Sequence, residues 1–358
     1  MTPERIASLR LYCQRITGSD AADPAAVLSR LGALQAQDYD AAIWAIGLRL
    51  PNGTIADIHR AIADRTIVRT WPMRGTLHFV AARDVRWMLR LLAPRAVAAA
   101  AGRHRQLGLD DAAFAHGHEV IAASLQGGIT RTRDAIYQSL EEAGIATAAQ
   151  RGYMLLWRAA QEGRICFAAH EGKQPAFALL DDWLPPGSDW TPPDPLAELA
   201  RRYFTGHGPA TVQDFAWWAG LKLSDARAGL AASADTLRSE EVGGRTYWMP
   251  REEPPADSGA TPSLHLLPGF DEYLLGYRDR DIVLAPEHAG KIVPGSNGVF
   301  LPTIVVDGKI VGTWKRTVKR STVVIEPVPF SPLSADQIAR LRAAAERYAR
   351  FRGLEVVV

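Results

Sequence analysis

Two glutamines separated by one residue, Gln35 and Gln37, are the side chains in this sequence around which a chemical role can be built. An amide cannot take a proton at neutral pH, but its carbonyl oxygen can align a water molecule and stabilise a developing positive charge. Polar side chains at the end of a helix more often cap or solvate that end. Residue types alone therefore favour capping, and a joint site for the two amides is the alternative.

The segment before the glutamines carries helix signals. Asp23-Pro24 reads as an N-cap followed by proline at the first helical position. Apolar side chains then recur at helical spacing at Val27, Leu28, Leu31 and Leu34. The pattern predicts a helix that runs into Gln35. Residues two apart on a helix point about 200° apart, so one site for both amides requires the helix to break or tighten near Ala36.

The composition is that of a globular protein with several domains. A chain of 358 residues exceeds one ordinary core, and no apolar run approaches the roughly 20 residues that span a bilayer. Residues 1–5 lack the layout of a secretion signal, so we expect a cytoplasmic protein with no membrane partner. Cys13 and Cys166 alone support neither a disulfide framework nor a thiolate metal cluster, and we expect no metal and no cofactor.

The charged residues are segregated, although the net charge is only +2. Arginines dominate residues 69–105, a second basic block covers 309–320, and acidic residues gather in 181–198. Segregation of this kind suits a polyanion held on one face. Ordinary solvated helix and strand faces are an equally good explanation.

Three segments of the chain repeat one order of elements: a helix, a short bridge, two helices and a two-stranded ribbon. This is the order of a winged helix-turn-helix, so the pattern predicts three such domains in tandem, at residues 1–108, 109–190 and 191–252. Two helices, at 85–92 and 95–107, are expected to follow the first ribbon. In that ribbon Arg69, Arg74 and His78 are candidate phosphate contacts.

A Pro-, Gly- and Glu-rich linker at 251–262 separates these domains from a last domain at 260–358. There the strand-like runs are 263–267, 282–284, 298–306, 309–315, 322–328 and 356–358, which predict a small β-barrel. Ser334 and Gln337 stand in capping-box positions at the start of a C-terminal helix. Asp307-Gly308 is expected to form a two-residue hairpin turn of the primed type. Basic side chains follow this turn at Lys309, Lys315, Arg316 and Lys319.

Four motifs together resemble those of the bacterial winged-helix DNA glycosylases. They are Leu34-Gln35-Ala36-Gln37, Arg69-Thr70-Trp71-Pro72-Met73-Arg74-Gly75-Thr76-Leu77-His78, Leu267-Pro268-Gly269-Phe270-Asp271 and Val306-Asp307-Gly308-Lys309-Ile310-Val311-Gly312-Thr313-Trp314. The similarity extends from about Pro3 to Val328. It implies an α+β fold of three tandem winged helices and a C-terminal small β-barrel, C-shaped around a DNA channel.

The resemblance also implies a catalytic role for the glutamine pair. The family signature is glutamine, an apolar residue, then glutamine in the AlkZ-like branch or aspartate in the YcaQ-like branch. Gln35-Ala36-Gln37 matches the AlkZ-like branch, and Asp38 lies one place beyond the aspartate position. We therefore expect a monomeric, monofunctional glycosylase that removes N7-alkylated purines from double-stranded DNA, with interstrand crosslinks left open as substrates.

The chemistry fits this expectation. Glycosidic hydrolysis usually needs an acid for the leaving group and a base or nucleophile at the anomeric carbon. An N7-alkylated purine already carries a positive charge and needs no acid, so two amides that hold a water can suffice. The Asp307 to Lys309 hairpin would then probe the duplex near the lesion, with an ordinary barrel hairpin as the alternative.

Other constellations favour structural roles. His116-Gly117-His118-Glu119 lacks further ligands at zinc-like spacing, and Trp217-Trp218 fit core packing. Asp271 of the pair Asp271-Glu272 is expected to be structural, because adjacent residues on a strand point to opposite faces. The rival function is a non-catalytic winged-helix DNA-binding protein such as a transcription regulator, which usually is a symmetric dimer and not a tandem chain. A scaffold that binds proteins is the third possibility.

Overall fold

Capping side chains start several helices where the sequence indicates. The carboxylate of Asp23 accepts a hydrogen bond from the backbone N–H of Ala26 at 2.8 Å, with Pro24 as the first helical residue. Ser334 and Gln337 form the expected capping box of the C-terminal helix. These signals are local, which is why the sequence reveals them.

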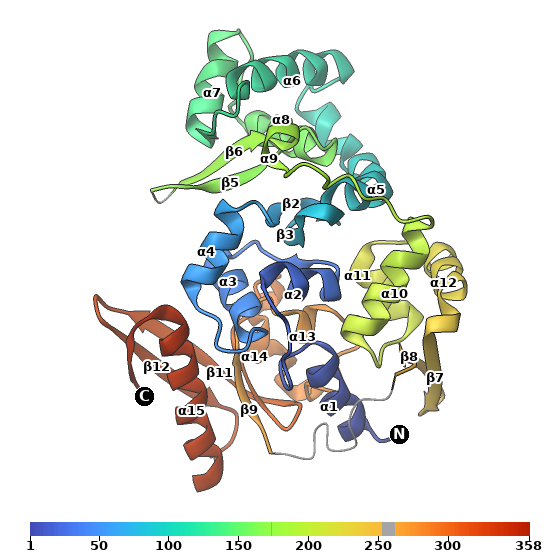
Figure 1. The fold of residues 1–358 in the computed structure, drawn as a ribbon, viewed down its shortest axis with the longest axis vertical. Helices are drawn as coiled ribbons and strands as arrows, with labels where there is room; N and C mark the ends of the chain where they lie inside the picture. Colours follow the sequence, from blue (N-terminus) through green and yellow to red (C-terminus); the bar gives the residue numbers. More distant parts are fainter. Residues whose placement is uncertain (173, 253–261) are drawn as a thin grey trace. The chain divides into compact units, whose positions relative to one another are not determined.

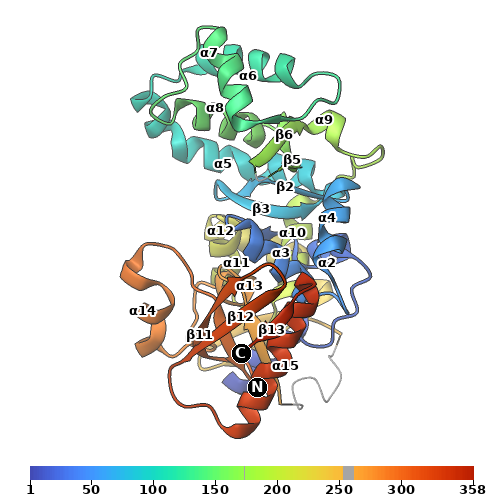
Figure 2. The same cartoon turned by 90° about the vertical axis from the view of Figure 1, so that its left-hand side faces the viewer.

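The computed structural model describes residues 1–172, 174–252 and 262–358 (Figures 1 and 2). The chain consists of two compact units. Unit 1 comprises Met1–Ile58 and Leu196–Val358, and unit 2 comprises His59–Pro195. Unit 2 is therefore an insertion in the sequence of unit 1. Most of the expected linker at 251–262 lies outside the described residues. Among the described helices, none combines the length and the apolar character that crossing a membrane requires.

The first part of unit 1 is mainly helical. Its elements are α1 (Pro3–Cys13), α2 (Pro24–Leu31), β1 (Leu34–Gln35), α3 (Tyr39–Leu48) and the start of α4 (Ile55–Ala63). The expected helix into Gln35 is wrong at its end, because α2 stops at Leu31. Gly32 follows with a φ of +82°, a conformation open mainly to glycine, and redirects the chain into an extended strand. Leu34 is buried in that strand, so its helical spacing was coincidental.

Unit 2 combines helices with one antiparallel sheet. Its helices are α5 (Val85–Gln106), α6 (Asp111–Leu125), α7 (Arg133–Glu142), α8 (Arg151–Gln161) and α9 (Leu180–Trp183). Its strands are β2 (Ile67–Met73), β3 (Thr76–Ala81), β4 (Arg131–Thr132), β5 (Ile165–Glu171) and β6 (Gln174–Leu179), which lie in the order β3-β2-β5-β6-β4. Figure 1 shows α6, α7 and α8 on one side of the β5–β6 ribbon. The buried core between them includes Leu155, Trp157 and Phe177.

One helix replaces the two that were expected after the first ribbon. The helix α5 runs without interruption through Pro94. A proline inside a helix removes the hydrogen bond to the carbonyl four residues earlier, here that of Arg90. Both Arg90 and Pro94 are exposed, so water can bind that carbonyl group and the helix continues.

The second part of unit 1 begins with three helices and a ribbon. These are α10 (Pro195–His207), α11 (Val212–Ala219), α12 (Leu223–Ala232), β7 (Leu237–Val242) and β8 (Arg245–Pro250). They are followed by β9 (Leu264–Leu267), α13 (Glu272–Leu275), α14 (Ala289–Ile292), β10 (Thr303–Val306), β11 (Lys309–Val318), β12 (Thr322–Pro329), α15 (Ala335–Arg352) and β13 (Glu355–Val357). The expected strand at 282–284 is a turn, and the strand expected at 298–306 is confined to Thr303–Val306.

The C-terminal strands form a half-barrel, where the sequence pattern predicts a small β-barrel. Their order is β13-β12-β11-β10-β9, with only β12 and β13 parallel, and β9 and β13 are its edges among the described residues. The helix α15 packs along this sheet (Figure 2). The fold as a whole is mixed α+β.

An aromatic cluster joins α3 to the half-barrel. The ring of Tyr348 in α15 lies 5.0 Å from that of Trp44 and 5.3 Å from that of Trp314, measured between centroids. The indole N–H groups of both tryptophans donate to carbonyl oxygens of β9, at 2.8 Å each. Buried indoles with satisfied N–H groups make this a firm contact, and it anchors the helix that directly follows Gln37.

Candidate active site

The glutamine pair lies between a strand and a helix, with Gln35 in the strand and Gln37 in the bend that follows it. Gln35 ends β1, and Asp38 is the N-cap of α3, where its carboxylate accepts from the backbone N–H of Ala41 at 3.0 Å. The side-chain amides of Gln35 and Gln37 are within hydrogen-bonding distance of each other. They therefore face the same side, a condition that a continuous helix would not meet.

The two amides are hydrogen-bonded to each other. Nε2 of Gln35 donates to Oε1 of Gln37 at 2.6 Å, and the backbone N–H of Gln37 donates to Oε1 of Gln35 at 3.2 Å. Gln35 is 4 % exposed, whereas Gln37 is exposed. The pair is thus asymmetric: Gln35 is the inner amide, and it orients the outer amide of Gln37.

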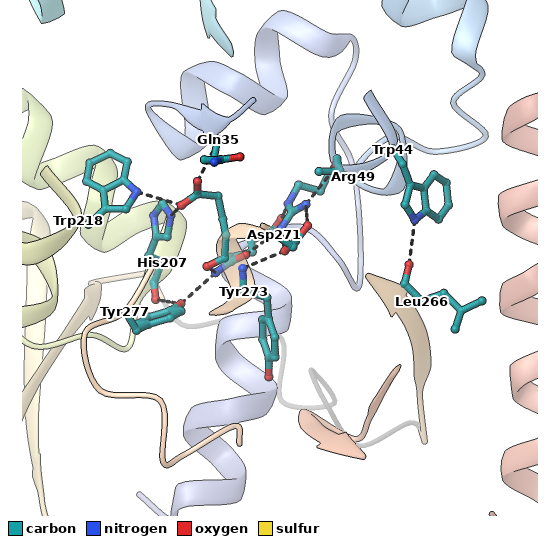
Figure 3. A network of polar contacts seen from close by, with 12 residues as sticks. Gln35, Trp44, Arg49, His207, Trp218, Leu266, Asp271, Tyr273 and Tyr277 are labelled. Atoms are coloured by element: carbon teal, nitrogen blue, oxygen red, sulfur yellow. Dashed lines mark hydrogen bonds and ion pairs between the residues drawn. The ribbon is translucent and has the colours of Figure 1, made fainter. Parts of the chain in front are cut away.

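A buried carboxylate that the sequence pattern does not single out, Glu272, contacts the backbone of Gln35. Figure 3 shows Trp218 and His207, two of its partners, near Gln35. Oε1 of Glu272 accepts from the backbone N–H of Gln35 at 3.1 Å. Its Oε2 accepts from the indole N–H of Trp218 at 2.9 Å and lies 3.3 Å from Nε2 of His207. Glu272, Trp218 and His207 are all 0 % exposed. Three distant parts of the chain therefore meet at the backbone of Gln35.

The neighbouring Asp271 holds this arrangement from the other side. The sequence pattern predicts a strand at Asp271, but in the structure this residue is the N-cap of the short helix α13. Its two carboxylate oxygens accept from Nη1 and Nη2 of Arg49 at 2.9 and 2.8 Å, in a bidentate pair that is almost fully buried. Arg49 also donates to the backbone and side-chain oxygens of Gln14. The expected structural role of Asp271 agrees with these contacts.

Two buried tyrosines complete the network. The hydroxyl of Tyr277 donates to the carbonyl oxygen of His207 at 2.6 Å, and that of Tyr273 donates to the carbonyl oxygen of Gly308 at 2.7 Å. Burial raises the pKa of both phenols above the ordinary value of 10. Both hydroxyls therefore serve as neutral donors that fix the surrounding backbone.

The predicted DNA contacts of the first ribbon belong to unit 2. Arg69 and Arg74 are half-buried, and the guanidinium of Arg69 lies 4.8 Å from the centroid of the Phe167 ring. His78 is fully buried, with Nδ1 2.9 Å from the carbonyl oxygen of Thr76. A side chain without exposed surface cannot meet a phosphate, so His78 is not retained as a DNA contact.

The hairpin turn at Asp307-Gly308 has φ values of 47° and 85°, which confirms the primed type. It is packed against α1, because a Cβ added to Gly308 would lie 2.7 Å from the Cβ of Ala7. Nζ of Lys309 donates to a backbone carbonyl at 2.7 Å. Gly308 and Lys309 thus make contacts typical of a structural hairpin, whereas Asp307 is exposed. The role of the hairpin as a probe of the duplex, with a DNA contact by Lys309, stays a prediction.

The basic side chains in the second half of β11 and directly after it differ from Lys309. Lys315 and Lys319 are exposed, and Arg316 is half-buried with its guanidinium 5.9 Å from the centroid of the Tyr348 ring. These three side chains belong to unit 1, as do the two glutamines.

Within residues 1–172, 174–252 and 262–358, no group of three or more His, Cys, Asp or Glu side chains is placed to hold a metal ion. His118, from the His-Gly-His motif, instead lies 3.3 Å from Glu162.

Comparison with known proteins decides what kind of protein carries this site. The profile of the family described as "DNA glycosylase AlkZ-like" matches residues 28–351. The chain belongs to the AlkZ-like DNA glycosylase family. It is therefore an enzyme of the DNA glycosylase class, a hydrolase of N-glycosyl bonds, and its substrate is DNA.

The sequence match and the structural match both come from Streptomyces sahachiroi. A protein named "Interstrand DNA cross-link repair glycosylase" is 28 % identical over 322 residues, which cover 85 % of this chain and 84 % of that protein. The solved structure of the S. sahachiroi DNA glycosylase AlkZ is similar with a TM-score of 0.80 and 26 % identity, over 100 % of this chain and 99 % of that one. The recognition of the AlkZ-like branch from the four sequence motifs is confirmed.

Proposed function

We propose that this AlkZ-like protein is a monofunctional glycosylase for N7-alkylated, cationic purines, with the hydrolytic water held by Gln35 and Gln37. The observation that carries the proposal is the hydrogen-bonded amide pair, in which the exposed Gln37 is oriented by the buried Gln35. The carbonyl oxygen of the outer amide can align a water and stabilise positive charge that develops at C1′.

Among residues 1–172, 174–252 and 262–358, the two carboxylates that adjoin the pair are both engaged and are not placed as acids for a leaving group. Asp38 is engaged as the N-cap of α3, and the carboxylate of Glu272 is buried against the backbone of Gln35. A base that leaves without protonation must already be activated, and N7-alkylation does this by placing a positive charge on the purine. The proposed substrate class is therefore supported both by the amide pair and by the engagement of the neighbouring carboxylates.

The mechanism is hydrolysis without a covalent enzyme intermediate. The first 172 residues of the sequence contain no lysine, so no amine close in sequence to the glutamines can form a Schiff base with the deoxyribose. The sugar approaches the transition state as an oxocarbenium ion, which even a weakly activated water can capture.

Interstrand crosslinks are a second substrate under this proposal. Most enzymes that act on a base in duplex DNA must first extrude it, and a purine tied to both strands cannot swing out. Gln37 is exposed on the surface, where it can reach a nucleotide that remains in the duplex. The relative named for interstrand cross-link repair supports this part of the proposal.

Base release from alkylated DNA tests the proposal. Wild-type protein should release 7-methylguanine from a duplex and leave undamaged guanine in place. Gln35→Ala and Gln37→Ala should each lower the single-turnover rate by about 100-fold, the typical cost of misplacing a reacting group. Gln138→Ala removes an exposed glutamine of α7 and should change nothing. Full activity in both site variants would end the proposal, and a protein–DNA adduct trapped by borohydride would replace hydrolysis with a Schiff-base mechanism.

We propose further that three winged-helix domains (1–108, 109–190 and 191–252) and the half-barrel domain (260–358) of one monomer grip the DNA in a channel. The element orders α2-β1-α3-α4-β2-β3, α6-β4-α7-α8-β5-β6 and α10-α11-α12-β7-β8 support the three repeats. The backbone bridge between Ala210 and Trp248 stands in the third copy where β1 and β4 stand in the others. Arg69, Arg74, Lys315, Arg316 and Lys319 are the proposed phosphate contacts, and binding to chromosomal DNA would place the enzyme at the nucleoid in the cytoplasm.

A further inference from the structure

A fully buried carboxylate is an expensive feature, and nothing in the hydrolysis of the glycosidic bond uses Glu272 directly. Burying an ionised group costs several kcal/mol unless it is well hydrogen-bonded. Glu272 is 0 % exposed and does not reach the DNA. It contacts the glutamine motif through the hydrogen bond from the backbone N–H of Gln35. That contact raises the question of what the carboxylate does for the site.

The hydrogen bonds indicate that Glu272 is ionised and that His207 is neutral. Each carboxylate oxygen accepts from a group that can only donate, namely the backbone N–H of Gln35 and the indole N–H of Trp218. The ring of His207 points Nε2 at Oε2 of Glu272, and no described hydrogen-bond partner meets its Nδ1. An imidazolium would leave Nδ1–H buried and unsatisfied. The tautomer with the proton on Nε2 therefore donates a third hydrogen bond to the carboxylate.

The carboxylate is held from several elements at once. Trp218 belongs to α11, His207 ends α10, and Glu272 begins α13 directly after the Asp271 that is paired with Arg49. By contrast, the segment from Gly32 to Gln37 contains only the two residues of β1 as regular structure. The rigidly held carboxylate of Glu272 thus accepts a hydrogen bond from the backbone N–H of Gln35, in a strand of only two residues.

We infer that Glu272 is a positioning residue, which fixes the backbone of Gln35 and thereby sets the place of the amide that holds the water. The inference rests on the proposed function of the glutamine pair. Because the Gln35 side chain donates directly to Gln37, a displacement of the Gln35 backbone moves both amides. Glu272 acts on the chemical step through this path and leaves the DNA-binding surface unchanged.

Three variants test separately the length of the side chain at residue 272, its charge, and the hydrogen bond that Trp218 donates to it. Glu272→Gln keeps the shape and removes the charge, and Glu272→Asp keeps the charge but withdraws it by one methylene. Trp218→Phe retains a ring and removes the N–H that holds Oε2, with Trp217→Phe as the matched control on the same helix. We measure the single-turnover release of 7-methylguanine, the Kd for the same duplex by fluorescence anisotropy, and the thermal unfolding midpoint.

Both Glu272 variants should lower the single-turnover rate by about 10- to 100-fold, with a Kd within about twofold of wild type, because only the reacting geometry is disturbed. Trp218→Phe should lower the rate by roughly 3- to 10-fold, a partial loss of the same kind. Trp217→Phe should leave it unchanged. A Glu272→Asp variant with the wild-type rate would show that charge alone matters and would overturn the positioning role.

A second measurement distinguishes the positioning role of Glu272 from a purely structural role. In a Gln37→Ala background, Glu272→Gln should lower the remaining rate by less than about twofold, since residues that act as a unit are not additive. An equally large loss in both backgrounds would overturn the inference. If the Glu272 variants do not fold, a wild-type rate in folded Trp218→Phe overturns it instead.

The two proposals can fail separately. If the Gln35 and Gln37 variants are inactive while the Glu272 variants keep the wild-type rate, only the positioning role fails. If the glutamine variants keep full activity, the proposed function fails, and the positioning role fails with it.

Discussion

Replacing Asp271 by asparagine should be among the most destabilising conservative changes in unit 1. The side chain of Arg49 is 0 % exposed, and its guanidinium makes five hydrogen bonds, two of them to the carboxylate of Asp271. Asparagine keeps the shape but offers one oxygen, and its NH₂ group faces a donor. The guanidinium is left buried without a counter-charge, which costs about 3–5 kcal/mol.

Urea unfolding followed by peptide-resolved hydrogen exchange measures this cost in unit 1 alone. With a urea m-value of about 2–3 kcal/mol/M, the midpoint for unit 1 peptides should fall by roughly 1–2 M, and that of unit 2 peptides should stay in place. The matched control is Asp20→Asn, because Asp20 pairs with Arg15 at 3.1 Å but its side chain is 70 % exposed. An exposed pair of this kind contributes about 0–1 kcal/mol. If Asp271→Asn lowered the midpoint no more than Asp20→Asn, the argument from burial would be refuted.

Three further predictions concern other parts of the chain. A hydrogen bond from His118 lowers the pKa of Glu162 from 4.5 to about 2, so this carboxylate stabilises the fold above pH 4.5 and the contribution is lost as the pH falls toward 2. Glu162→Gln should therefore flatten the pH dependence of the unfolding free energy between pH 4.5 and 2, and an unchanged slope in urea titrations would contradict this. Gly308→Ala should cost about 1–3 kcal/mol, since the new Cβ would lie 2.7 Å from a methyl carbon of α1 at a φ of +85°. Gly298→Ala, at a φ of +77° with nothing within 4 Å, should cost about 1 kcal/mol or less, and equal unfolding midpoints for the two would refute the clash. Lys319→Ala should reduce the slope of log K against log salt by about 0.9 if Lys319 meets a phosphate, as measured by anisotropy between 50 and 200 mM salt, and an unaltered slope removes it from the DNA contacts.

The local features of this fold could be predicted from the sequence. The caps at Asp23 and Ser334 and the primed turn at Asp307-Gly308 each depend on residues within a few positions of one another, so their sequence signals are sufficient. Most helices and ribbon strands expected within 109–252 are present for the same reason, whereas their arrangement as two winged-helix repeats stays a prediction. The strand β1 is hidden in the sequence because Leu34 continues the helical spacing of α2, although Gly32 with its positive φ ends that helix.

The glutamine pair could be found from the sequence, but its support could not. Glu272 is 237 residues from Gln35, and a single sequence does not show which distant groups meet. The local pattern Glu272-Tyr273-Leu274-Leu275 gives no signal either, because a glutamate is rarely fully buried unless it is paired. A buried carboxylate needs donors, and Trp218, which was assigned to packing alone, supplies one of them.

The insertion of unit 2 into unit 1 has a consequence for how the enzyme is made. A ribosome adds roughly 5–20 residues per second, and domains fold as units during synthesis. The 237 residues between Gln35 and Glu272 therefore take roughly 10 to 50 s to appear. During that interval unit 2, which is one continuous segment, can complete its own core. A nascent chain thus displays the whole glutamine motif long before it can be an active glycosylase, and a chain that is released before residue 272 carries the motif without the carboxylate that holds it.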